Sequence, residues 1–99
     1  MRKLIRFVRA ILEHAVHTYA EKFRGSPLYF NVAPEEVDIY FSTFARYDLD
    51  AVAQGFLEIL TMDKNDPTFD IKRGILADRY TRLLGYYQAR EAHRHGAKP

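Results

Sequence analysis

Residues 2–24 read RKLIRFVRAILEHAVHTYAEKFR, and the spacing of the apolar residues in this stretch predicts a long amphipathic helix. Apolar side chains recur every three or four positions and form one broad stripe, made of Leu4, Ile5, Val8, Ile11, Leu12, Ala15, Val16, Tyr19 and Phe23. The other side carries Arg2, Lys3, Arg6, Glu13, His14, His17 and Glu21, and Gly25 is the expected stop. We therefore expect a helix that packs one side on a core.

Helical spacing continues through the middle of the chain. Ala33-Pro34-Glu35-Glu36 predicts a helix start, because proline suits the first helical position and acids suit the positive end of the helix dipole. The inner face of this helix is expected to be Val37, Tyr40, Phe41, Phe44 and Tyr47. Asp48 is the expected cap of a third helix, whose inward residues are Leu49, Val52, Ala53, Phe56, Ile59 and Leu60.

A turn at Asp63-Lys64-Asn65-Asp66-Pro67 precedes a fourth helix from about Thr68 to Ala92, with Asp66 or Thr68 as its cap. The inward stripe of that helix is Phe69, Ile75, Leu76, Tyr80, Leu83, Leu84 and Tyr87. Gly74 and Gly85 are expected to be points where another helix approaches closely.

The predicted fold class is all-α, a small bundle of about four helices in which two long outer helices flank two shorter middle ones. Residues 27–32 are expected to form an extended connector with room for a turn or a short strand. We expect one helical domain over residues 1–92 and a flexible C-terminal tail over residues 93–99.

The formal net charge of +2 conceals three blocks of opposite sign. Residues 2–24 carry six basic and two acidic side chains, residues 25–68 carry two and eight, and residues 69–99 carry seven and three. The long outer helices are thus basic and the middle pair is acidic. Three readings stay open: the basic faces pair with the protein's own acidic middle, they meet another protein, or they bind a polyanion.

The composition excludes several classes of protein. With 99 residues there is room for one small domain, and without cysteine there is no disulfide framework and no thiolate zinc site. No apolar run approaches the ~20 residues that span a bilayer. The basic start resembles that of a signal peptide, but Arg6, Arg9, Glu13 and His14 interrupt any apolar region. We expect a cytoplasmic protein.

Several patterns that carry chemistry in other proteins are incomplete here. Glu13 and His17 have the i,i+4 spacing of metal ligands, but no third strong ligand is identifiable. The acidic run from Asp63 lacks the glycine and glutamate of a calcium loop. A helix-turn-helix over residues 35–62 would have an acidic reading helix that phosphates repel. With no nucleophile motif and no phosphate-cradling loop, we expect no enzymatic activity, no cofactor and no metal.

The candidate contact residues lie on the two outer helices. They are Arg2, Lys3, Arg6, Phe7 and Arg9 on the first, and Arg79, Arg82, Tyr86 and Arg90 on the last. Tyr80 and Tyr87 are expected in the core, whereas Phe7, Ile39 and Tyr86 border the apolar stripes and are expected to be exposed.

The hypothesis that follows is a non-catalytic protein–protein interaction module. Such a module could be an accessory subunit, an adaptor or an inhibitor in a larger assembly, and its partner is another protein or a second copy of the chain. The alternative is sequence-independent nucleic-acid binding through the basic first and last helices. Association with an anionic membrane surface through residues 2–24 is a third class, which the pattern favours less.

Overall fold

The computed structural model describes residues 2–27 and 32–94, and within these ranges the chain is helical and contains no strand. The elements in order are α1 (Arg2–Lys22), α2 (Pro34–Ile39), the π-helical turn η1 (Tyr40–Phe44), α3 (Ala45–Thr61) and α4 (Phe69–Arg94). Because α2, η1 and α3 follow one another without a break, the described chain forms three rods. The all-α prediction is confirmed. The extended connector expected over residues 27–32 falls mainly on residues outside the described ranges.

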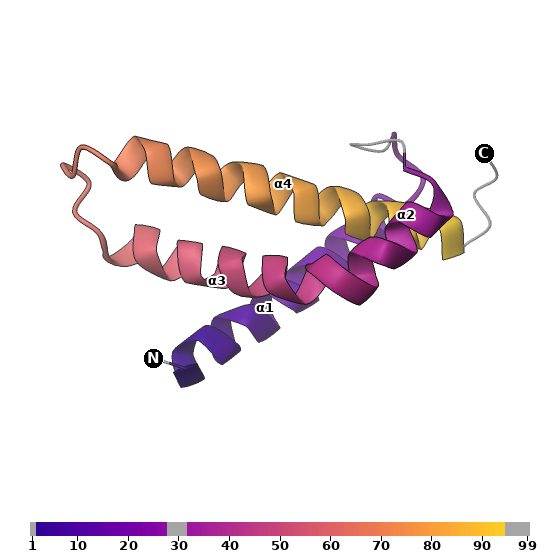
Figure 1. The fold of residues 1–99 in the computed structure, drawn as a ribbon, viewed down its shortest axis with the longest axis horizontal. Helices are drawn as coiled ribbons and strands as arrows, with labels where there is room; N and C mark the ends of the chain where they lie inside the picture. Colours follow the sequence, from indigo (N-terminus) through magenta and orange to yellow (C-terminus); the bar gives the residue numbers. More distant parts are fainter. Residues whose placement is uncertain (1, 28–31, 95–99) are drawn as a thin grey trace.

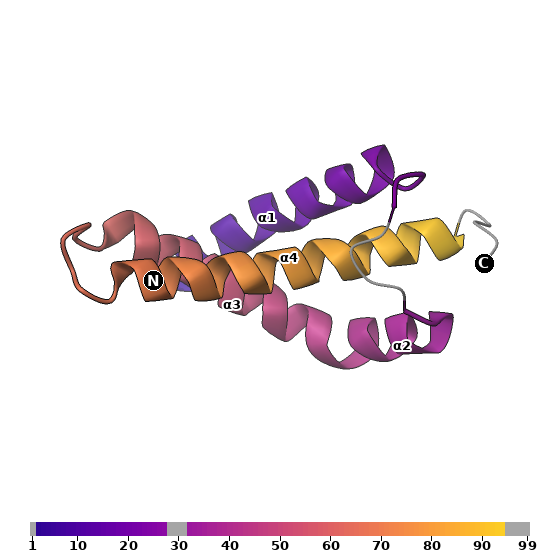
Figure 2. The ribbon, with the colours of Figure 1, turned by 90° about the horizontal axis from the view of Figure 1, so that it is seen from above.

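The three rods pack side by side (Figure 1). Helices α3 and α4 run antiparallel and are joined by the loop at residues 62–68. Helix α1 contacts both of them, and the short α2 contacts α4. Figure 2 shows α1 and the rod formed by α2, η1 and α3 diverging on the two sides of α4. The molecule is elongated, with extents of 47 × 27 × 24 Å.

The core is a single cluster to which every rod contributes. From α1 it takes Leu12, Val16 and Ala20; from the middle rod Tyr40, Ala45, Leu49 and Val52; and from α4 Leu76, Leu83, Leu84 and Tyr87. Phe56 and Ile59 are partly buried against this cluster, as is Tyr80, whose ring lies edge-on to Phe56. The inward stripe predicted for the last helix is thus confirmed for Leu76, Leu83, Leu84 and Tyr87, whereas Ile75 is exposed.

The predicted break between two middle helices at Tyr47-Asp48 is wrong. The chain instead continues through η1, where the N–H of Ala45 donates to the carbonyl of Tyr40, five residues earlier. A π turn inserts one extra residue, so every later side chain is rotated by about one position around the axis. The inner face therefore passes from Tyr40 to Ala45 and Asp48, while Phe44 and Tyr47, both predicted inward, are exposed. Uninterrupted helix also rules out the helix-turn-helix arrangement.

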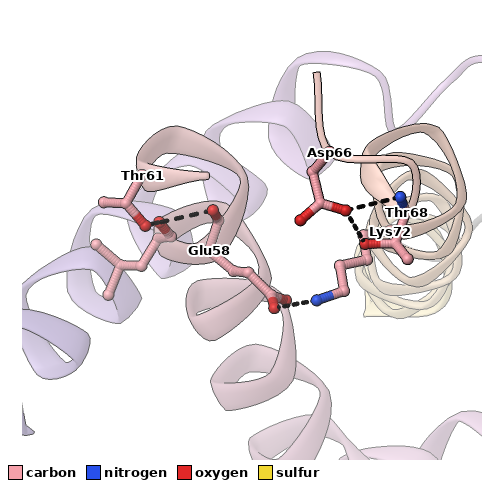
Figure 3. A network of polar contacts seen from close by, with 6 residues as sticks. Glu58, Thr61, Asp66, Thr68 and Lys72 are labelled. Atoms are coloured by element: carbon pink, nitrogen blue, oxygen red, sulfur yellow. Dashed lines mark hydrogen bonds and ion pairs between the residues drawn. The ribbon is translucent and has the colours of Figure 1, made fainter. Parts of the chain in front are cut away.

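Polar contacts hold the connection between α3 and α4 (Figure 3). The Asp66 carboxylate accepts bonds from the backbone N–H and the hydroxyl of Thr68, at 2.8 and 2.7 Å. Thr68 precedes the first residue of α4, and its carbonyl accepts the N–H of Lys72 at 3.0 Å. Lys72 in turn donates to Glu58 of α3 at 2.7 Å. The predicted turn and helix start are therefore confirmed.

Gly55 of α3, for which the sequence predicted no packing role, is in tight contact with α4. A Cβ on Gly55 would lie 2.8 Å from Cδ1 of Leu76, so the leucine side chain packs directly against the glycine. Gly74 faces open space, and its predicted role as a packing point is wrong. Gly85 is buried.

Helix α4 continues beyond the expected end at Ala92. His93 and Arg94 are helical, and a ring nitrogen of His93 lies 3.3 Å from the carbonyl oxygen of Val32. The predicted tail is thus wrong for these two residues, and its remainder lies outside the described ranges.

Candidate functional site

Helix α1 has two apolar faces. Leu12, Val16 and Ala20 are buried against the other helices. Leu4, Phe7 and Ile11, which we call the outer stripe, are 48%, 64% and 55% exposed. Successive helical residues are rotated by about 100°, so these two sets lie on nearly opposite sides of α1. The single broad stripe that the sequence predicted is therefore divided, and Leu4 and Ile11 belong to the exposed part.

The basic residues of α1 are distributed between solvent and an internal ion pair. Arg2, Lys3 and Arg6 are exposed and form no ion pair with any part of the chain that the structure describes. Arg9 instead donates to the Asp50 carboxylate of α3 at 3.0 Å. Of the five candidate residues on this helix, Phe7, Arg2, Lys3 and Arg6 remain available to a partner.

A buried carboxylate organises the middle of α4. Asp48 is fully buried and accepts two bonds from Arg82, at 3.0 Å from Nε and 2.6 Å from a terminal nitrogen. The Tyr40 hydroxyl donates to the same carboxylate at 2.7 Å. The rings of Tyr40 and Tyr86 stack with centroids 3.9 Å apart. Arg82 and Tyr86, both predicted as contacts, therefore serve mainly to hold the fold, and Tyr86 is half-buried rather than exposed.

The electrostatics of this cluster follow from burial and from the paired charges. Burial, followed by the hydrogen bond to Asp48, raises the pKa of Tyr40 far above its ordinary value. The hydrogen bond to Asp48 raises the pKa of Arg82, which keeps the guanidinium positive at any physiological pH. The cluster is thus a neutral phenol and an ion pair, an arrangement suited to locking two helices together.

The remaining candidates on α4 lie about three turns apart along the helix and line different cavities. Arg79 is half-buried and lines a shallow groove between α3 and α4 that also includes Tyr47 and Lys72. The Arg90 guanidinium carbon lies 3.8 Å from the centre of the Phe41 ring, a cation–π contact. Among the sequence candidates on the two outer helices, Arg9 and Arg90 line the same cavity, whereas Arg79 lines another.

Three ion pairs connect the basic outer helices to the acidic middle rod. They are Arg9 with Asp50, Arg82 with Asp48, and Lys72 with Glu58. Part of the charge asymmetry seen in the sequence is therefore internal pairing. This was one of three readings that the sequence left open.

Two polar residues with structural roles were missed from the sequence. Asp48 looked like a helix cap, because an acid after an aromatic run is the usual signal of one. Gln88 is almost fully buried, and its side-chain amide donates to the carbonyls of Phe23 and Pro27 just after α1. A glutamine on the edge of an amphipathic stripe carries no local signal for such a contact.

Searches among family models, curated proteins and solved structures find no match to this chain. Among the described residues, no helix is long and apolar enough to cross a membrane. The same residues contain no group of three or more histidine and acidic side chains that could hold a metal ion. Any function must therefore be argued from the surfaces described above.

Proposed function

We propose that this chain is a non-catalytic protein–protein interaction module that pairs with a second copy of itself through the outer stripe of α1. The observation that carries the proposal is the exposure of Leu4, Phe7 and Ile11 on α1, where Leu4 also borders a groove lined by Leu57 of α3. Apolar side chains at i, i+3 and i+7 make a seam that a second helix can cover. Contiguous exposed apolar residues rimmed by charge are typical of interaction surfaces.

The helix dipoles favour an antiparallel arrangement of the two copies. The first half of the helix carries Arg2, Lys3, Arg6 and Arg9, whereas residues 13–24 contain two acids and two bases. A parallel pair would bring two strongly basic halves together. Because the outer stripe spans residues 4–11, an antiparallel pair centred on it also brings these basic halves together, but it opposes the two helix dipoles. It is the arrangement that a two-fold symmetric dimer can use.

Sedimentation velocity over a wide range of protein concentration tests this proposal. We expect the mass to rise from monomer to dimer, and Phe7→Glu to weaken the dimer by about 100-fold or more, because each dimer buries the ring twice. Leu60→Glu is the matched control, since Leu60 is 78% exposed and lies on α3. A monomer at every concentration, or an equal effect of the two substitutions, would refute the proposal.

Sequence-independent nucleic-acid binding is the alternative function. Its support is the exposed, unpaired set Arg2, Lys3 and Arg6, while the pairing of Arg9 and Arg82 with acids reduces the basic surface. A gel-shift series with single-stranded DNA tests it, since phosphate-driven binding is strongest at about 50 mM salt or below. Absence of a shift there would eliminate this alternative.

The outer stripe with basic residues beside it also resembles a helix that lies on an anionic membrane. Flotation with vesicles that contain phosphatidylserine separates this case from self-association, because only a membrane-bound protein rises with the vesicles. For the self-associating module we also propose a cytoplasmic location, since a chain without cysteine needs no oxidising compartment to fold.

A further inference from the structure

Four arginines from three helices surround one cavity. The cavity has a volume of about 630 Å³, which is typical of a small-molecule site. Arg9 comes from α1, Arg46 from α3, and Arg90 and Arg94 from α4. The cavity's α1 residues, Arg9, Glu13 and His17, lie on the side of that helix opposite the outer stripe.

The positive charge of this cleft is only partly neutralised. Glu13 is the one acid that lines it, against four guanidinium groups. Arg9 gives one bond to Asp50, and a terminal nitrogen of Arg94 stands 3.7 Å from Glu91. Arg46 and Arg90 form no ion pair within residues 2–27 and 32–94. Each guanidinium has five N–H donors, so most donors here have no carboxylate partner.

Arg90 occupies the most confined position in the cleft. Its guanidinium packs on the rings of Phe41 and Tyr87, with its central carbon 3.8 and 5.0 Å from their centres. Its Nε is buried and makes no hydrogen bond to any described residue. Burial, together with the nearby Arg94 charge, lowers the pKa of Arg90. Aromatic contact thus fixes the orientation of a cation that forms no ion pair with a described acid.

We propose that this cleft binds a small anion that carries phosphate groups. Arginine forks match the oxygen geometry of phosphate, and several of them together favour a group with two or more negative charges over a single carboxylate. Arg46 comes from α3 and Arg94 from α4, and the rings of Phe41 and Tyr87 hold the Arg90 guanidinium in place. The negative charge of Glu13 repels a bound anion and lowers the affinity of the cleft for it.

Isothermal titration calorimetry with sodium pyrophosphate, at constant ionic strength, tests the site. We expect one saturable site per chain. Arg46→Ala should weaken binding about tenfold, through loss of a charge-assisted contact. Glu13→Gln should strengthen it about threefold, because a repelling charge is removed. Both positions are exposed, and circular dichroism verifies that each variant folds.

Arg73→Ala is the matched control, since Arg73 is an exposed arginine outside the cleft and the variant has the same net charge as Arg46→Ala. It should bind like the unmodified protein. A second titration with phosphoserine distinguishes the source of the phosphate. If phosphoserine binds more tightly than pyrophosphate, the ligand of the cleft is a phosphate ester; if it binds more weakly, the ligand is a phosphate anhydride. Absence of a saturable site for both probes, or an equal loss in the two arginine variants, would overturn the proposal.

Discussion

Replacing Arg82 by alanine leaves the buried Asp48 carboxylate with one hydrogen-bond donor instead of three. In the intact protein Arg82 supplies two of these bonds and Tyr40 supplies the third. The substitution does not remove the negative charge, which stays enclosed between the middle rod and α4. The destabilisation therefore arises from an uncompensated buried charge rather than from lost packing.

The magnitude follows from the burial of the two partners. Removing one member of a buried ion pair costs about 3–5 kcal/mol. Asp48 is fully buried, but the Arg82 side chain is 50% exposed, so water can enter where the guanidinium stood. We therefore expect the lower end, about 3 kcal/mol. For a domain of this size that corresponds to a fall of roughly 12–24 °C in Tm.

Urea unfolding followed by far-ultraviolet circular dichroism measures this change, provided that the slope with denaturant is unchanged. Arg73→Ala is the control, because the Arg73–Asp70 pair is exposed and its loss should stay within about 0.5 kcal/mol. The double variant Asp48→Ala, Arg82→Ala removes the stranded charge as well. We expect it to be more stable than the sum of the two single effects predicts, by about 1–3 kcal/mol.

Two results would refute this account of the Asp48 cluster. One is a cost for Arg82→Ala that matches the control. The other is strict additivity in the double variant, which would mean that the carboxylate is not stranded when Arg82 is absent.

Three further predictions concern other parts of the molecule. Gly74→Ala should stabilise the protein by about 0.5–1 kcal/mol in the same assay, because the position is helical and a Cβ there meets nothing; a loss of stability would contradict the structure. Because the pKa of Tyr40 is raised, its contribution to stability is present below about pH 10 and is lost as the pH rises above that value. Alkaline denaturation should therefore be shallower in Tyr40→Phe, and identical curves would count against the buried phenol. The Thr68 hydroxyl and N–H lower the pKa of Asp66, so the stability this carboxylate contributes is lost only as the pH falls through that lowered value. Thr68→Val should raise the pKa of Asp66 toward its ordinary value in a carbon-13 titration, and an unchanged pKa would show that the hydroxyl contributes nothing.

Ion pairs within the fold account for part of the alternation of basic and acidic blocks along the sequence. Basic helices at both ends suggested a polyanion, yet Arg9, Arg82 and Lys72 each bind an acid of the middle rod. Such pairs add little stability when exposed, but they favour one arrangement of the helices over others. Among the cations without an ion pair on the described part of the chain, Arg2, Lys3 and Arg6 lie near the outer stripe, and Arg46 and Arg90 line the cleft.

The helices themselves were largely predictable, because amphipathic spacing and start and stop signals are local properties. Proline at position 34, the turn before Phe69 and the long apolar stripes placed the elements within a few residues. The number of rods was not predictable in the same way. A change of phase in the apolar pattern near residue 47 has two local explanations, a new helix or a π turn, and only packing on α4 selects the second.

The predicted contact residues on the two outer helices fall into two groups. For one group the exposure was predictable from the sequence, and for the other it depends on partners that are distant in the chain. Exposure of Phe7 and Ile39 was predicted from their positions beside the apolar stripes, and both are exposed. Arg82 and Tyr86 have the same local appearance as exposed contacts, but the Asp48 carboxylate and the Tyr40 ring hold them in place. Their partners lie 34 and 46 residues away in the chain, and no helical periodicity reports contacts at that distance.

The sequence by itself determined that the protein is helical, where most of its helices begin and end, and which residues carry its charge, since these depend on neighbours within a few turns. The tertiary structure alone decided which part of the α1 apolar surface is buried, which arginines pair with acids, and that four arginines share one cleft. Burial and charge pairing depend on which helices meet. That choice is made by the whole core at once and is not encoded in any single segment.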